Sequence, residues 1–88
     1  MPKSLQPKKL RINNRKKAIV AANFMSYRAL FLAVQETLGT EISYGSFMKT
    51  IYGELVSGPK AEMVMETISN LVKRKVETLW PEIRENAA

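Results

Sequence analysis

Apolar residues recur at helical spacing through most of the chain, and this pattern constrains the fold more than any other feature of the sequence. Side chains three, four, seven and eleven positions apart share one face of an α-helix, so each such segment predicts a helix that buries one side. The segments 27–38, 44–55 and 61–72 follow this spacing. No segment shows a convincing strand pattern. The chain is therefore expected to be all-α, a compact bundle of four or five helices.

Capping residues predict where these helices begin and end. Ser26 can accept a hydrogen bond from a free first-turn amide of the helix 27–38, and Gly39 is placed to end that helix. Pro59 suits the first position of a later helix, because its missing amide hydrogen would have no partner there. Pro81 is expected to break a short carboxy-terminal helix.

The first 12 residues differ from the rest of the chain. They hold two prolines and four cations without apolar periodicity, so residues 1–12 are expected to form a flexible basic arm and residues 13–88 the folded domain. Asn13 or Asn14 can cap the first helix of that domain. A break near residues 23–26 is preferred, but no Pro or Gly separates the first two helices, so one continuous helix is also compatible with the sequence.

The positive charge is concentrated at the amino terminus. The net charge is +6, yet residues 1–17 carry seven cations and no acid, whereas residues 18–88 carry seven cations against eight acids. A basic segment on a nearly neutral body favours a polyanion such as nucleic acid as partner, because neutralised phosphates release condensed counterions. The alternative is a solvated tail that only aids solubility.

The composition disfavours catalysis and membrane insertion. The chain has no His, Cys or Asp, which removes the usual general base, the thiolate nucleophile and most metal-ligand sets. A glycine-rich phosphate loop is also missing, so neither an enzyme nor a cofactor is expected. No apolar run approaches the ~18 residues that a membrane span needs. The lack of cysteine fits a reducing cytoplasm, and we expect a cytoplasmic protein.

The segment 43–56 is the candidate element for DNA recognition. Its apolar back leaves a front of small and polar side chains, which allows close approach to another surface. A major groove about 12 Å wide admits an α-helix, and Ser, Thr and Lys can donate to base edges or phosphates. An ordinary surface face is the alternative. The order of helix, turn and polar-fronted helix is that of a helix-turn-helix, with the first helix lying across the DNA backbone.

The expected DNA contacts come from three parts of the chain. The polar front of the recognition element offers Ser43, Ser46, Lys49 and Thr50. The start of the preceding helix offers Arg28 for a phosphate. The basic amino-terminal region offers Lys8, Lys9, Arg11, Arg15, Lys16 and Lys17, for the backbone or the minor groove. Three of these cations are expected at the start of the first helix, where the helix dipole opposes them and a phosphate would favour them.

Four stretches within residues 26–83 resemble the small phage repressor, Cro and Ner-type regulators, which share the lambda-repressor-like fold. The stretches are "SYRALFLAVQETLG", "SYGSFMKTIYGE", "SGPKAEMVMETISNLV" and "VETLWPEI", the last being similar to the ending of several Ner-like proteins. The resemblance implies a bundle of four or five helices that binds operator DNA, usually as a dimer. It also implies that Ser43, Tyr44, Ser46, Lys49 and Thr50 form the exposed start of the recognition helix. The chain departs from the family pattern in the turn, which "GTEIS" lengthens.

The sequence thus predicts a sequence-specific transcriptional regulator of phage or mobile-element type, such as a repressor. It is expected to bind double-stranded DNA as a homodimer or a cooperative oligomer. An excisionase-like architectural protein is a close alternative, because it needs the same surface. A small inhibitor or adaptor that uses Met63 and Met65, and a non-specific RNA or DNA binder, are further alternatives. Trp80 and Ile83 are candidates for a dimer contact, with a core position as the competing interpretation of Trp80.

Overall fold

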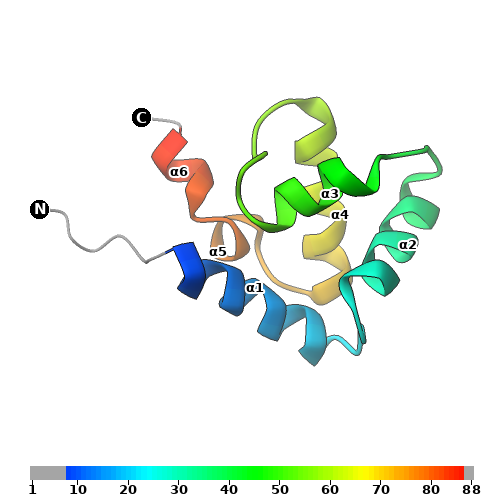
Figure 1. The fold of residues 1–88 in the computed structure, drawn as a ribbon, viewed down its shortest axis with the longest axis horizontal. Helices are drawn as coiled ribbons and strands as arrows, with labels where there is room; N and C mark the ends of the chain where they lie inside the picture. Colours follow the sequence, from blue (N-terminus) through cyan, green and yellow to red (C-terminus); the bar gives the residue numbers. More distant parts are fainter. Residues whose placement is uncertain (1–7, 87–88) are drawn as a thin grey trace, which may run out of the picture.

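A computed structural model describes residues 8–86, which form six helices and no strand, so the all-α prediction is confirmed (Figure 1). The helices are α1 (Lys8–Ala21), α2 (Tyr27–Leu38), α3 (Tyr44–Ile51), α4 (Pro59–Val72), α5 (Val76–Leu79) and α6 (Glu82–Asn86). Helix α4 is central and packs against α1, α2, α3 and α5. In Figure 1, α3 crosses in front of α4, with α2 on the right and α1 below.

The boundaries predicted at Ser26, Gly39, Pro59 and Pro81 are confirmed. The Ser26 hydroxyl accepts a hydrogen bond from the Ala29 amide at 3.1 Å. Gly39 ends α2 with φ 68°, a left-handed conformation that glycine adopts without a steric penalty. Pro59 opens α4, and the chain breaks between α5 and α6 at Pro81. Helices α1 and α2 are separate, which excludes the continuous-helix alternative.

Two helix boundaries differ from the sequence prediction. Helix α1 begins at Lys8 instead of Asn13 or Asn14, so residues 8–12 belong to a helix; residues 1–7 of the expected arm lie outside the described residues. Tertiary packing accounts for these additional helical residues, because Arg11 is buried on the inner face of the first turns of α1. Helix α3 ends at Ile51, short of the predicted residue 56, because Gly53 has φ 80° and leaves the helical conformation.

The lengthened connection between α2 and α3 is held against the bundle. The Ile42 amide donates to the Gln35 side-chain oxygen at 3.3 Å, and the Ile42 side chain is buried. Ser43 then caps α3, its hydroxyl accepting from the Ser46 amide at 3.2 Å. The turn is therefore fixed at both ends, which sets the direction in which α3 leaves it.

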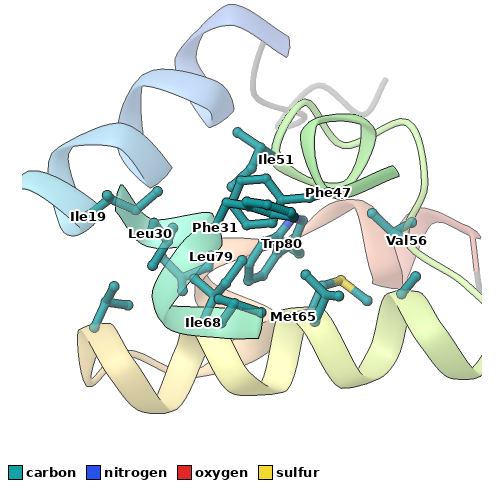
Figure 2. Packing of buried hydrophobic residues seen from close by; sticks show 14 of the residues in the cluster. Ile19, Leu30, Phe31, Phe47, Ile51, Val56, Met65, Ile68, Leu79 and Trp80 are labelled. Carbon is teal, nitrogen blue, oxygen red and sulfur yellow. The ribbon is translucent and has the colours of Figure 1, made fainter. Parts of the chain in front are cut away.

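The core lies between α4 and the helices packed around it. Figure 2 shows Trp80 among Phe47, Leu79 and Met65. The Trp80 side chain has 0% exposure and its indole nitrogen donates to the Thr50 carbonyl at 2.8 Å. This confirms the core interpretation of Trp80 and removes it as a dimer contact.

Candidate nucleic-acid interface

Helix α3 shows one polar face to the surface. Gly45, Ser46 and Lys49 are exposed, whereas Phe47 and Ile51 on the opposite side are buried at 1% and 0% exposure. The predicted apolar back is present, and the predicted polar front is present without Thr50, which is 1% exposed. Because Gly45 and Ser46 are small, a flat or convex surface can approach the helix backbone here, with Lys49 projecting one turn further along.

Arg28 and the start of α3 converge although they are separated by the whole of α2. The Arg28 guanidinium lies over the Tyr44 ring, 4.9 Å from its centroid. Tyr44 itself packs edge-on against Phe31 at a centroid distance of 5.0 Å. The half-buried ring therefore supports an exposed cation, a contact worth about 0.5–1 kcal/mol at an open site. The predicted site residues Arg28, Tyr44 and Ser43 are brought together.

A lysine that the sequence reasoning missed lies at the same surface. Lys60, in the first turn of α4, lines a shallow hollow of about 170 Å³ together with Ser43 and Ser46. A cation in the first turn of a helix is disfavoured by the helix dipole, and a phosphate would favour it there. The cations at the start of the first helix were assigned to phosphates for this reason, and Lys60 at the start of α4 could have been identified in the same way. Lys60 adds a third exposed positive side chain around α3, with Arg28 at the start of this helix and Lys49 in its last turn.

The carboxyl end of α3 is fixed from behind by two buried side chains. Arg15 Nε donates to the Ile51 carbonyl at 2.7 Å, and Trp80 Nε1 donates to the Thr50 carbonyl at 2.8 Å. A helix ends in carbonyls with partial negative charge, so a guanidinium is favourable there. Because α1 and the α5–α6 junction both hold this end, α3 is positioned as a rigid element with its polar face outward.

Arg15 is the centre of a larger buried network. Its Nη1 donates to the Leu79 carbonyl at 2.8 Å and to Glu82 Oε1 at 2.9 Å, and its side chain is 1% exposed. Its guanidinium also lies 5.7 Å from the Trp80 ring centroid. One side chain therefore connects α1 with the ends of α3, α5 and α6.

Three of the predicted DNA contacts are corrected by these positions. Arg15 is enclosed by the network above, Arg11 is 8% exposed, and Thr50 is 1% exposed on the inner side of α3. The two arginines are enclosed by the fold, and Thr50 is almost fully buried among the residues that line the hollow of Ser43, Ser46 and Lys60. The cations Lys8, Lys9, Lys16 and Lys17 are exposed on α1, but no hollow at the front of α3 includes them.

Tyr27, at the start of α2, is the titratable group whose environment is most clearly perturbed. Burial raises the pKa of its phenol above the usual 10.0, the nearby Tyr52 raises it further, and Arg15 lowers it. The phenol therefore stays neutral at physiological pH, where it can donate or accept a hydrogen bond. Among residues 8–86, no His, Cys, Asp or Glu side chains gather into a group that could hold a metal ion.

The chain was compared with protein-family models, curated proteins and solved structures. No protein-family model, curated protein or solved structure matches the chain. The resemblance to phage regulators therefore stays a prediction. In the described part of the chain, no helix has the length and apolarity needed to cross a bilayer.

Proposed function

We propose that the chain is a sequence-specific regulator that binds double-stranded DNA by placing α3 in the major groove. The observation that carries the proposal is the small polar front of α3, held rigidly by the buried Arg15 and Trp80 at its far end. A recognition helix needs both properties, because base contacts give specificity only when the side chains are held in register.

The cations around α3 support the same proposal. Arg28, Lys49 and Lys60 are all exposed. Arg28 lies at the start of α3, Lys49 lies on its polar face, and Lys60 lies in the first turn of the neighbouring α4. In this arrangement Ser46 and Lys49 read base edges, while Arg28 and Lys60 contact phosphates on either side of the groove. The exposed Lys8 and Lys9 on α1 extend the contact along the backbone.

The test is selection of binding sites from random duplexes with the purified chain. A specific regulator recovers a defined motif, and a palindromic or repeated motif indicates a homodimer or an array. Recovery of random sequence, with affinity that falls steeply with salt, would instead indicate a non-specific binder. A recovered motif that the protein bends strongly in a gel-shift assay would favour the architectural, excisionase-like role.

Matched variants then locate the contact. Ser46→Ala and Lys49→Ala should weaken binding to the selected site by about 1–3 kcal/mol per lost base contact, with a smaller effect on random duplex. Lys60→Ala should weaken binding to all sequences and reduce the salt slope by about 1. Lys75→Ala removes an equally exposed lysine from the α4–α5 connection and serves as the control. If Lys49→Ala and Lys75→Ala had equal effects, α3 would not be the recognition helix.

A further inference from the structure

The outer side of α1 carries an apolar groove that the proposed DNA contact does not use. Lys16, Val20 and Met25 line one hollow of about 270 Å³, and Lys16, Lys17 and Val20 line a second of about 420 Å³. The two hollows share Lys16 and Val20, so they adjoin; we call them together the α1 groove. Val20 is 57% exposed and Met25 is 93% exposed. A phosphate backbone would engage the lysines but leave these two apolar side chains in water.

Helix α4 carries a surface of complementary character. Its buried side faces the core, and its outer side exposes Met63 at 44%, with Glu62 and Glu66 exposed beside it. The two glutamates are one turn apart, so they lie on the same side of the helix. We call Glu62, Met63 and Glu66 the α4 ridge. It presents an apolar side chain with two negative charges along one side, where the α1 groove presents apolar side chains with two positive charges.

We propose that the α1 groove binds the α4 ridge of a second copy of this chain. Lys16 and Lys17 pair with Glu62 and Glu66, while Met63 enters the apolar hollow beside Val20 and Met25. Methionine is suited to this role because its unbranched thioether adapts to irregular gaps. The α1 groove and the α4 ridge thus match in charge and in apolar character. Because both surfaces belong to this chain, a second copy can provide the partner surface.

The two surfaces lie on different parts of the molecule, so each copy carries both halves of the contact. The carboxyl end of α1 meets the carboxyl end of α4, where Ala22 and Val72 line one hollow. The α4 ridge lies in the amino-terminal half of this 14-residue helix, which is about 21 Å long. A copy that uses its groove and its ridge on the same partner forms a two-fold dimer, whereas a copy that uses them on two different partners forms a ring or an open array.

The first measurement is cross-linking of the full chain without DNA. An equal mixture of unlabelled and ¹⁵N-labelled chain is treated with a carbodiimide, which joins lysine amines to glutamate carboxylates without a spacer. Mass spectrometry should find cross-links of mixed isotope composition between Lys16 or Lys17 and Glu62 or Glu66. Mixed composition identifies contacts between copies. The proposal would be overturned by a chain that sediments as a monomer, or by an oligomer that gives no such peptides.

Charge reversal supplies the second measurement, by sedimentation equilibrium. Lys16→Glu with Lys17→Glu should weaken self-association about tenfold or more, as should Glu62→Lys with Glu66→Lys. The chain with all four changes should associate again, because attraction is restored with both signs exchanged. Lys75→Glu with Glu77→Lys, also at exposed positions, is the control and should have no effect. All these side chains are exposed, so the fold is expected to be kept and circular dichroism verifies it.

Two results would refute the assignment of the partner. If the fourfold variant failed to associate, the α1 groove would bind something other than the α4 ridge. If the Lys16 and Lys17 reversal weakened DNA binding and left sedimentation unchanged, these lysines would be phosphate contacts instead. The cross-linking and sedimentation are carried out without DNA, so their outcome is separate from the success or failure of the proposed DNA recognition.

Discussion

Replacing Gly53 by alanine tests the packing that fixes the carboxyl end of α3. Gly53 has φ 80°, in the left-handed region that residues with a Cβ rarely adopt. A methyl group there would overlap Glu82 Oε2 and lie 2.9 Å from Glu82 Cδ and 3.1 Å from Arg15 Nη2. The substitution therefore adds backbone strain and also displaces the carboxylate that pairs with Arg15.

The expected loss of stability has two parts. The left-handed conformation costs a residue with a Cβ roughly 1–2 kcal/mol. Breaking a buried ion pair costs about 3–5 kcal/mol when one charge is left without its partner, and a carboxylate that shifts without leaving costs a fraction of this. Gly53→Ala should therefore lower the free energy of unfolding by at least ~2 kcal/mol. For a chain of this size that corresponds to a fall in Tm of about 8–16 °C.

Three other glycines provide matched controls for thermal and urea unfolding. Gly39 and Gly58 also have positive φ, but a Cβ at either would meet no atom within 4 Å, so Gly39→Ala and Gly58→Ala report the strain alone. Gly45 lies within α3 without positive φ, and Gly45→Ala should stabilise the protein by about 0.5–1 kcal/mol. If Gly53→Ala cost no more than Gly39→Ala, the close approach of Glu82 to the backbone would be refuted.

Three further perturbations address the core, a helix cap and pH. Trp80→Phe removes one of two donors to the Thr50 carbonyl, which keeps the Gly53 amide at 3.0 Å, so the loss of this hydrogen bond should cost about 0.5–1.5 kcal/mol in urea titrations, without changing the helix content. Ser26→Ala removes the cap of α2 and should cost about 1 kcal/mol, whereas Thr40→Ala, at an exposed position in the next connection, should be close to neutral. Burial raises the pKa of Tyr27 above 10.0, so the folded state favours its neutral phenol; stability should be unaffected by this group below pH 10.0 and should fall as the pH rises through the folded-state pKa. Tyr27→Phe should remove that part of the alkaline decline.

Local signals in the sequence predicted most of the helices. Apolar spacing located α2 and α4, and Ser26 and Gly39 marked the ends of α2, because periodicity and capping depend on near neighbours along the chain. The end of α3 was misplaced because apolar spacing continues to residue 55, past Gly53, where the chain leaves the helix with φ 80°. The side chains that a Cβ at Gly53 would meet, Glu82 and Arg15, are not brought near by sequence spacing.

The buried arginines were not predictable in the same way. Arg11 and Arg15 stand in a run of cations, which is typical of a solvated segment. What buries Arg15 is a set of acceptors on Ile51, Leu79 and Glu82, between 36 and 67 positions away. The topology of the fold determines long-range partners of this kind. The charge pattern of the sequence therefore predicted a DNA contact for Arg15, whereas Arg15 forms hydrogen bonds inside the fold.

The burial of these arginines changes the role that the amino-terminal charge can have in DNA binding. Among residues 8–17, Lys8, Lys9, Lys16 and Lys17 are exposed, whereas Arg11 and Arg15 are enclosed. Counterion release depends only on cations that reach phosphates, so the salt slope should be shallower than the count of basic residues suggests. Arg15 contributes to recognition differently, by holding α3 in place. Arg15→Lys, which keeps the charge but loses the planar fork, should therefore destabilise the fold and weaken binding to the cognate site while leaving the salt slope on random duplex unchanged, and a reduced slope would restore Arg15 as a phosphate contact.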